Sequence, residues 1–341
     1  MTTAPARPHV ARLTYMEAVV DAIASEMRRD PRVVYIGQDV GAMGGSMQGT
    51  HGLFDAFGPR RVREAPIAES GMLGLAIGAA LYGLRPIVEV SFGEFLPAAM
   101  NQLINQAPNL RYMTGGAASV PVVVRTRVGD GPYGGHPQDY SAWFAHVPGL
   151  KVVMPATPAD ARGLMLAAIR DPNPVLFFEP MSLAHASRED VPLTDEPLAI
   201  GPARVARPGH DLTLVAIGSM VPVALQAADR LAHDGLAEVE VIDLRCLRPW
   251  DPALVLESVR RTGRLATVHE AWVEGGFGAE VVATVAERAG LSGLGGLHPG
   301  LRAPVVRVGA LPVPIPSGKL RGYALPNVDR LVDALRPVLS S

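Results

Sequence analysis

Residues 64–91, EAPIAESGMLGLAIGAALYGLRPIVEVS, decide the fold of this 341-residue chain. The first part is apolar and carries glycines at a spacing that predicts a helix which another helix can approach closely. The branched residues of RPIVEVS then predict a buried strand. Glu69 stands at the head of the helix as the one acidic residue between Ala65 and Val88. We expect its carboxylate to be partly desolvated. Desolvation raises the pKa of a carboxyl group unless a partner stabilises the charge. A carboxyl group with a raised pKa is suited to share a proton with a ligand. The structural alternative, equally open at this point, is an acid at a helix N-terminus with Ser70 as a cap.

The composition limits the class of protein. Hydrophobic residues make up 48% of the chain, which predicts an ordered globular protein long enough for two domains. The formal charge of −2 gives no reason to expect a nucleic acid or an anionic membrane as a partner. The single cysteine, Cys246, excludes an internal disulfide and fits a reducing compartment. We expect a cytoplasmic protein, because the N-terminus lacks the apolar segment of a signal peptide and the apolar run from Met72 to Leu84 is too short to cross a membrane.

Strand-like and helix-like segments alternate along the chain, which predicts an α/β fold with parallel sheets. We expect a flexible tail over residues 1–12, an N-terminal parallel-sheet domain over 13–180, a polar linker over 181–205 and a second α/β domain over 206–341. Thr157 and Pro158 predict a helix start, as N-cap and first helical residue, and residues 93–113 predict one further helix. Ligands bind outside the carboxyl ends of the strands in such sheets, so the site is expected there.

The loop after residue 128 carries candidate chemistry. GDG at 129–131 is the first half of a motif that holds magnesium and the diphosphate of thiamin diphosphate. The paired asparagines of the second half are absent, because residues 150–165 contain no Asn. We therefore expect these glycines to shape a turn. His136 follows two glycines, and a histidine on such a loop can act as acid or base near neutral pH; an exposed loop histidine without a role is the alternative.

Two further kinds of site can be weighed from the residue types. The histidines and the cysteine show no ligand spacing that would predict a zinc site. Phe92, Phe95, Trp143 and Phe144 can line an aromatic pocket, although core packing is the commoner use of such residues.

Several stretches together resemble the β subunit of thiamin-diphosphate-dependent 2-oxo acid dehydrogenases, the decarboxylating component of the pyruvate, branched-chain 2-oxo acid and acetoin types. The resembling pieces are IGQDVGAMGG, FGPRRVREAPIAESGMLGLAIGAALYGLRPIVEVSFGEF, INQAPNLRYMTGG, WFAHVPGLKVVMPATPADARGLM, IRDPNPVLFFEP, IDLRCLRPWD and HEAWVEGGFGAEV. As a set they are far more specific than any single motif. The resemblance implies two transketolase-like α/β domains, of which the first is pyrimidine-binding-like.

The resemblance also implies site residues. Glu69 matches the glutamate that hydrogen-bonds the aminopyrimidine ring and promotes the imino tautomer, which removes the thiazolium proton. Phe95 matches an aromatic position beside the pyrimidine. His136 matches the histidine that assists transfer of the acyl group to a lipoyl group. Asp171 and Asn173 resemble a potassium-binding piece.

Partners and cofactors follow from the same resemblance. Two β chains assemble with two α chains, and the α chain holds most of the diphosphate and magnesium of thiamin diphosphate. The glycines from Gly74 to Gly83 resemble the pattern for close helix packing at the subunit interface. The substrate is then a small 2-oxo acid, and a lipoyl acyltransferase is a further partner. FFEP is typical of the branched-chain type and WFAHVPGLKVVMPATP of the acetoin or pyruvate type, which leaves the substrate open.

The chain departs from the family's pattern at three positions. Gln38 and Asn101 stand where the family usually carries acids of a path proposed to link two active sites, and an amide cannot relay a proton as a carboxyl group does. Pro137 replaces the serine of the usual HSQ sequence. Two alternatives stay open, and these three changes motivate the first of them. One is a specialised thiamin-diphosphate enzyme that makes or breaks a carbon–carbon bond without lipoyl transfer, and the other is a non-catalytic subunit that completes an interface.

Overall fold

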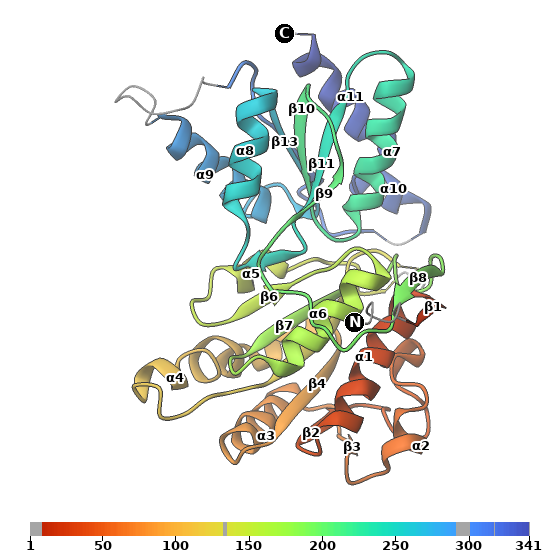
Figure 1. Cartoon of the computed structure of the whole chain (residues 1–341), viewed down its shortest axis with the longest axis vertical. Helices are drawn as coiled ribbons and strands as arrows, with labels where there is room; N and C mark the ends of the chain where they lie inside the picture. The colour runs from red at the N-terminus through yellow and green to blue at the C-terminus, as the bar shows by residue number, and fades with distance from the viewer. Residues whose placement is uncertain (1–8, 132–134, 291–300, 317, 341) are drawn as a thin grey trace, which may run out of the picture.

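Two α/β halves are stacked along the long axis of the molecule (Figure 1). The computed structural model describes residues 9–131, 135–290, 301–316 and 318–340. Within these ranges the N-terminal half forms a seven-stranded sheet and the C-terminal half a five-stranded sheet, with a separate two-stranded pair. The predicted α/β class is confirmed.

The N-terminal sheet has the strand order β12-β6-β7-β5-β4-β2-β3. Its strands are β2 (Val33–Gly37), β3 (Val62–Glu64), β4 (Arg85–Phe92), β5 (Val123–Val128), β6 (Lys151–Val153), β7 (Val175–Pro180) and β12 (Cys246–Arg248). All pair in parallel except β12, which comes from the C-terminal half and pairs antiparallel with β6. β5 and β7 are buried along their whole length, as expected of parallel strands that helices cover on both faces.

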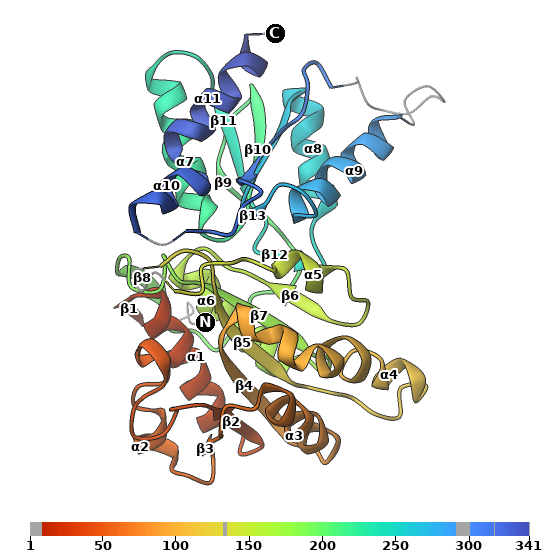
Figure 2. The same ribbon diagram turned by 180° about the vertical axis from the view of Figure 1, so that it is seen from behind.

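Helices cover both faces of this sheet (Figure 2). On one face α1 (Tyr15–Arg29) packs against α6 (Pro158–Arg170). On the other, α3 (Glu69–Leu81) packs against the 3₁₀-helical segment η2 (Gly93–Ala99) and the π-helical segment η3 (Gln102–Gln106). The shorter elements are η1 (Ser46–Gln48), α2 (Leu53–Phe57), α4 (Leu110–Met113) and α5 (Ser141–Ala145).

Local sequence explains where two of these helices begin. Thr14 and Glu17 form a capping box at α1, because Glu17 N donates to Thr14 Oγ1 at 3.2 Å and Thr14 N donates to Glu17 Oε2 at 2.9 Å. Thr157 Oγ1 accepts a hydrogen bond from Asp160 N at 3.2 Å, and Pro158 is the first residue of α6. The predicted start of this helix is confirmed.

The single helix predicted over residues 93–113 is wrong. Prolines at positions 97 and 108 remove amide donors that a continuous α-helix needs. The chain forms η2, η3 and α4 in succession instead.

The C-terminal sheet has the strand order β14-β13-β10-β11-β9. Its strands are β9 (Arg204–Arg207), β10 (Leu212–Ala216), β11 (Val239–Asp243), β13 (Leu265–Trp272) and β14 (Val306–Ala310). The helical elements of this half are α7 (Met220–His233), α8 (Pro252–Thr262), α9 (Phe277–Gly290), η5 (Gly318–Leu320), α10 (Arg321–Ala324) and α11 (Val328–Leu339). Among the described strands of this C-terminal sheet, only β9 runs antiparallel to its neighbour.

Two segments predicted to be irregular contain strands. β1 (Val10–Leu13) lies in the predicted tail and β8 (Glu189–Pro192) in the predicted linker, and the two pair antiparallel. Exposed residues occur along both strands, so neither shows the apolar alternation that identifies a half-buried strand. The prediction of a tail is therefore wrong for residues 10–12, and residues 1–8 lie outside the described part of the chain. In the part that is described, no helix combines the length and the apolar character needed to cross a membrane.

Candidate active site at the carboxyl edge of the N-terminal sheet

Four candidate residues follow the carboxyl ends of neighbouring parallel strands. Gln38 follows β2, Glu69 follows β3, Phe95 follows β4, and the loop that leads to His136 follows β5. Because β5, β4, β2 and β3 are adjacent and parallel, their carboxyl ends share one edge of the sheet. The structure therefore brings the sequence-predicted residues Glu69, Phe95 and His136 to the same edge.

Glu69 is the first residue of α3 and is buried, with 9% of its surface exposed. The helix has Ala68 at its N-cap and no side-chain cap, so the expectation of Ser70 as a cap is wrong. Gln38 Nε2 donates a hydrogen bond to Glu69 Oε1 at 3.4 Å. The contact supplies a donor to the carboxylate without bringing a second negative charge beside it.

An aromatic cluster of Phe92, Phe95 and His136 lies at this edge. The His136 ring stacks on Phe92 with centroids 4.6 Å apart and meets Phe95 edge-on at 4.8 Å. Glu94 contacts His136 Nδ1 at 3.1 Å and accepts a hydrogen bond from Gln138 N at 2.9 Å. These contacts engage Nδ1 and make Nε2 the ring nitrogen that can exchange a proton with a ligand. Glu94 was not among the sequence-predicted residues. Its position between two phenylalanines is the sequence signal that could have indicated it.

Both halves of the molecule hold the GDG turn. Gly129 has a φ of +77°, and a Cβ at this position would lie 2.6 Å from Glu270 Oε2. A Cβ on Gly131 would lie 2.6 Å from the Cβ of Met181. The glycines thus shape a turn, as predicted, and also allow close packing.

The carboxylate of Asp130 does not fit a magnesium ligand. Its Oδ1 forms an ion pair with Arg321 Nη1 at 2.6 Å. No cluster of three or more His, Cys, Asp or Glu that could hold a metal ion occurs among the residues described.

Asp171 and Asn173 lie together at the end of α6. Asn173 N and Nδ2 donate to Asp171 Oδ1 at 2.9 and 3.0 Å, and the Lys151 ammonium pairs with the other oxygen of Asp171. Arg111 Nη1 donates to Asn173 Oδ1 at 2.9 Å. Donors of this chain already occupy these side-chain oxygens, so the side chains alone do not form a potassium site.

A buried charge network lies within the same sheet. Arg125 Nε and Nη2 donate to the two Glu179 oxygens at 2.6 and 2.7 Å, and Arg127 Nη1 donates to Glu89 Oε1 at 3.0 Å. The hydroxyl of Tyr35 accepts from Arg125 Nη1 at 2.9 Å and donates to Glu89. The four charged side chains are each 1% exposed. The network therefore joins β2, β4, β5 and β7. Removing either charge of a buried pair would leave the other buried and uncompensated.

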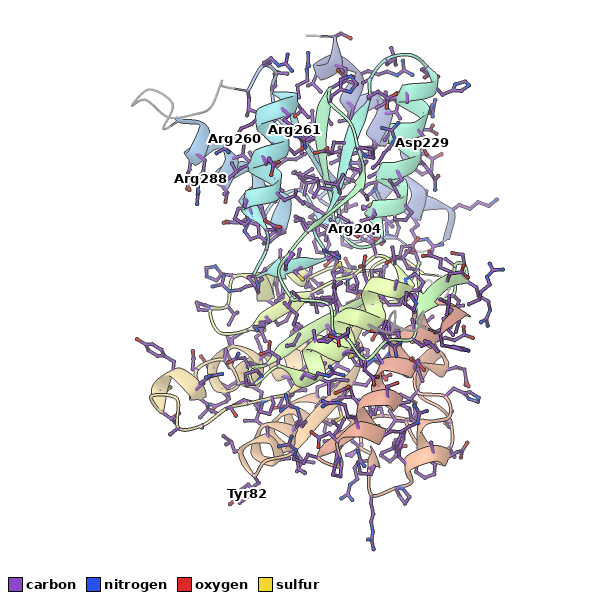
Figure 3. The ribbon with its side chains drawn as sticks, in the orientation of Figure 1. Tyr82, Arg204, Asp229, Arg260, Arg261 and Arg288 are labelled. Carbon is purple, nitrogen blue, oxygen red and sulfur yellow. The ribbon has the colours of Figure 1, made fainter. Side chains whose placement is uncertain are left out.

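α3 presents apolar surface that the described chain does not cover. Leu75 is 64% exposed, Leu81 46% and Tyr82 93%. Tyr82 projects from the end of the N-terminal half that lies away from the C-terminal half (Figure 3). A Cβ at Gly74 or Gly78 would meet no described atom within 4 Å. The helix that the sequence predicts to approach this face is thus not supplied by the described part of this chain.

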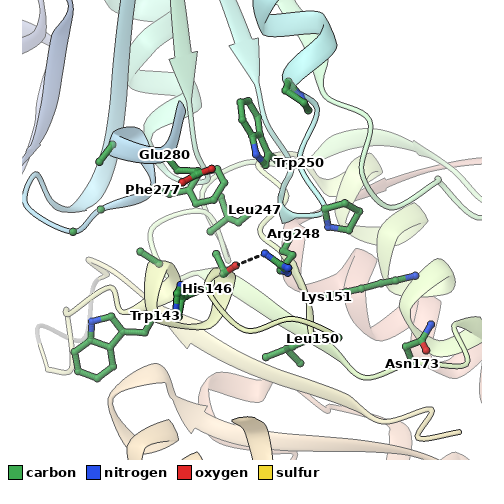
Figure 4. Close-up of a pocket in the computed structure, with 18 residues that line it drawn as sticks. Trp143, His146, Leu150, Lys151, Asn173, Leu247, Arg248, Trp250, Phe277 and Glu280 are labelled. Carbon is green, nitrogen blue, oxygen red and sulfur yellow. Dashed lines mark hydrogen bonds between the residues drawn. The ribbon is translucent and has the colours of Figure 1, made fainter. Parts of the chain in front are cut away.

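A cavity of about 1100 Å³ lies between the two halves (Figure 4). Trp143 and His146 line it from the N-terminal half, and Arg248, Trp250 and Phe277 line it from the C-terminal half. Arg248 Nη1 donates to Ala145 O at 3.1 Å, and both residues line the cavity. Of the sequence-predicted site residues, the lining of the cavity includes Asn173 and does not include Glu69, Phe95 or His136.

Comparisons with known proteins cover both halves of the chain. Residues 11–185 match the pyrimidine-binding domain of transketolase and residues 201–331 match the transketolase C-terminal domain. The pyruvate dehydrogenase E1 component subunit beta of Rhizobium meliloti (strain 1021) is 43% identical over 98% of this chain and 71% of its own length. The 2-oxoisovalerate dehydrogenase subunit beta of Bacillus subtilis (strain 168) is 40% identical over 95% of this chain and 98% of its own.

A solved structure has a similar fold over nearly the whole chain. A split-gene transketolase, described as an inactive beta4 tetramer, superimposes with a TM-score of 0.77 at 26% identity. The superposition covers 97% of this chain and 99% of the other. The two sequence matches, the two relatives and this fold agree, and the chain belongs to the family of transketolase-like β subunits of 2-oxo acid dehydrogenases.

Proposed function

We propose that this chain is the β subunit of a thiamin-diphosphate-dependent 2-oxo acid dehydrogenase, which decarboxylates a small 2-oxo acid and transfers the acyl group to lipoamide. The observation that carries the proposal is the gathering of Glu69, Phe95 and His136 at one edge of the N-terminal sheet. The family assignment supports it. Because relatives named for pyruvate and for 2-oxoisovalerate match over nearly the whole chain, the proposal stays with the class of 2-oxo acids.

The residues at this edge fit the aminopyrimidine of thiamin diphosphate. Glu69 offers a buried carboxylate as a hydrogen-bond acceptor, and Phe95 offers an aromatic face. When bound, thiamin diphosphate supplies a carbon nucleophile that adds to the substrate ketone and takes up the electrons of the departing carboxylate. Glu69 would share a proton with a ring nitrogen, donating the hydrogen bond while its carboxyl group is protonated and accepting it once the proton has moved to the nitrogen. The neutral partner Gln38 keeps a second negative charge away from this acceptor.

His136 is the residue we assign to acyl transfer. Glu94 engages its Nδ1, and the stack on Phe92 fixes the plane of the ring. Nε2 is then the atom that would give a proton to, or take one from, the sulfur of the acyl acceptor. An acceptor of this kind is carried by a lipoyl acyltransferase, which we propose as a further partner.

The diphosphate and its magnesium would be held mainly by an α subunit. The Asp130 carboxylate is paired with Arg321, so this chain's own GDG turn does not offer the ligand that the complete motif would use. A site that needs the pyrimidine from one chain and the diphosphate from another has to lie at an interface between unlike subunits.

The uncovered face of α3 supports such an assembly. A helix that is apolar all round is normally buried, yet α3 leaves Leu75 and its glycine positions open. We propose that a neighbouring subunit of a complex of two α and two β chains packs there.

A structural potassium ion remains a proposal that would depend on main-chain carbonyls near Asp171, since the side chains there are engaged. The buried free Cys246 supports a reducing compartment, for which we propose the cytoplasm.

Turnover of the reconstituted α–β complex tests the proposal. Decarboxylation is followed with an artificial electron acceptor and acyl transfer with lipoamide, for pyruvate and for branched-chain 2-oxo acids. Glu69→Gln is expected to lower decarboxylation about 100-fold or more, because an amide cannot hold the shared proton. Glu257→Gln, at an exposed position of α8, is the matched control and should behave as wild type. Full turnover by Glu69→Gln in an intact complex would contradict the role of Glu69, and turnover that never reaches lipoamide would favour an enzyme without lipoyl transfer.

A further inference from the structure

The loop that carries His136 leaves the sheet at a turn held from the C-terminal half. β5 ends at Val128, and the GDG turn follows directly. Asp130 N donates a hydrogen bond to the carboxyl group of Glu270, which lies on β13. Ser219 Oγ donates to the other oxygen of the same carboxyl group. One buried side chain of the C-terminal half therefore binds the turn and is itself fixed by the N-cap residue of α7.

Arg321 binds the turn from a second direction. Its Nη1 lies 2.6 Å from Asp130 Oδ1 and donates to Gly131 O at 2.8 Å. Gly129 leaves no room between the turn and Glu270, since any Cβ there would lie within 3 Å of all three atoms of the carboxyl group. The turn is thus held by contacts to its amide, its carboxylate and its carbonyl, and it packs directly against Glu270.

The far end of the loop also meets β13. The ring of Tyr140 lies 5.7 Å from the ring of Trp272, between centroids. Asp139 is buried, which raises the pKa of its carboxyl, and the charge of His269 on β13 partly opposes that rise. Glu270 and Trp272 of β13 therefore contact the two ends of the loop that carries His136, while Glu94 of the N-terminal half contacts His136 itself.

We propose that Glu270, with Ser219 and Arg321, is a positioning residue for His136: it fixes the turn at residues 129–131 and so makes acyl transfer depend on the C-terminal half. The inference rests on the proposed function of His136. Glu270 contacts the turn, whereas Glu94 contacts the ring of His136, so we assign Glu270 a positioning role rather than one in the chemistry. A displacement of about 1 Å at a reacting group is enough to cost about 100-fold in rate.

The conservative variant separates positioning from charge. In Glu270→Gln the amide oxygen can accept from Asp130 N while the amide nitrogen donates to Ser219 Oγ, so the turn stays held. In Glu270→Ala both groups lose their partner and a cavity opens beside Gly129. Arg321→Met removes the second group that holds the turn. The Arg321 side chain is 27% exposed, so its loss is less disruptive to folding than the loss of a fully buried group. Glu274→Gln and Lys319→Met, at exposed positions nearby, are the matched controls.

Two measurements on the complex with the α subunit test the proposal. Hydrogen exchange of the backbone amides over residues 128–140 should speed up in Glu270→Ala and Arg321→Met and stay as in wild type in Glu270→Gln and both controls. Acyl transfer to lipoamide should fall about 10-fold or more in the two anchor-breaking variants, whereas decarboxylation with an artificial acceptor should change much less.

Several outcomes would overturn the proposal. One is hydrogen exchange in Glu270→Ala and Arg321→Met that equals that of the wild type. Another is an equal loss of acyl transfer and decarboxylation in these variants. A third is a loss of acyl transfer in Glu270→Gln as large as in Glu270→Ala. If the wild type transfers no acyl group at all, the proposed function fails. The exchange of residues 135–140 then decides by itself, because unchanged exchange there overturns the positioning role and faster exchange supports it.

Discussion

Gln38 Nε2 donates to Glu69 Oε1 at 3.4 Å, so the carboxylate that we assign to the cofactor has a neutral amide as its neighbour. Gln38→Glu would place a second carboxyl group there, and two carboxyl groups this close share a proton. We expect the acid limb of the pH–rate profile for decarboxylation to move upward by about one pH unit or more. Gln48→Glu, at an exposed position, adds the same charge elsewhere and should leave the profile in place. Identical profiles for Gln38→Glu and wild type would contradict a functional contact between the two side chains.

His136→Ala should lower acyl transfer about 100-fold and decarboxylation far less, because the ring acts only after the carbon–carbon bond has broken. Glu94→Gln keeps a polar partner beside Nδ1 but removes its charge, so a smaller loss of acyl transfer is expected. The two rates are compared with lipoamide and with an artificial acceptor. His146→Ala, an exposed histidine ten positions further along, serves as the control. Equal losses in both reactions for His136→Ala would rule out the assigned role.

Glu270 makes a stability prediction with a definite sign. Burial raises the pKa of its carboxyl to about 8 from an ordinary value of 4.5, despite the hydrogen bonds from Ser219 and Asp130 N. The folded state then binds more protons than the unfolded state between these two values, so the free energy of unfolding falls as the pH rises from about 4.5 to about 8. One group contributes a slope of at most about 1.4 kcal/mol per pH unit. Denaturant unfolding at several pH values should show a shallower fall in Glu270→Gln, and the same slope in both proteins would contradict this account.

Arg125→Met should lower the free energy of unfolding by about 3–5 kcal/mol, because Glu179 and Glu89 are left buried without their shared cation. The measurement is urea unfolding followed by circular dichroism. Arg28→Met, at an exposed position on α1, removes an arginine without burying a charge and should cost much less. A loss below about 1 kcal/mol for Arg125→Met would show that water reaches the network.

Much of this structure could be predicted from residue patterns. The buried strand after residue 84 and the helix that Glu69 opens follow from local apolar patterning, and the start at Thr157 follows from capping chemistry. The β1–β8 pair could not be found, because both strands are largely exposed and their contact joins residues far apart in the sequence. The crossing of β12 into the N-terminal sheet was hidden for a related reason, since three residues give no periodicity of their own.

The site shows the same division. The resemblance marked Glu69, Phe95 and His136, and the parallel strand order explains why they share one edge. Glu94 and Glu270 were missed because each acts through a contact that only the folded chain makes, across 42 positions to His136 and 140 positions to Asp130. For Asp171 and Asn173 the sequence pattern predicted a cation site. It could not reveal that Lys151 and Arg111 contact the side-chain oxygens that a cation would use. Neither alternative, an enzyme without lipoyl transfer or a non-catalytic subunit, gains support from the names of the relatives.

A binding titration tests the central claim most directly. Thiamin diphosphate with magnesium is added to this chain alone, to the α subunit alone and to the two together, and binding is followed by calorimetry. The account predicts tight binding only to the mixture, and weaker binding when the mixture contains Glu69→Gln. Tight binding to this chain alone would mean that it holds the diphosphate itself, and a site shared between unlike subunits would then be contradicted.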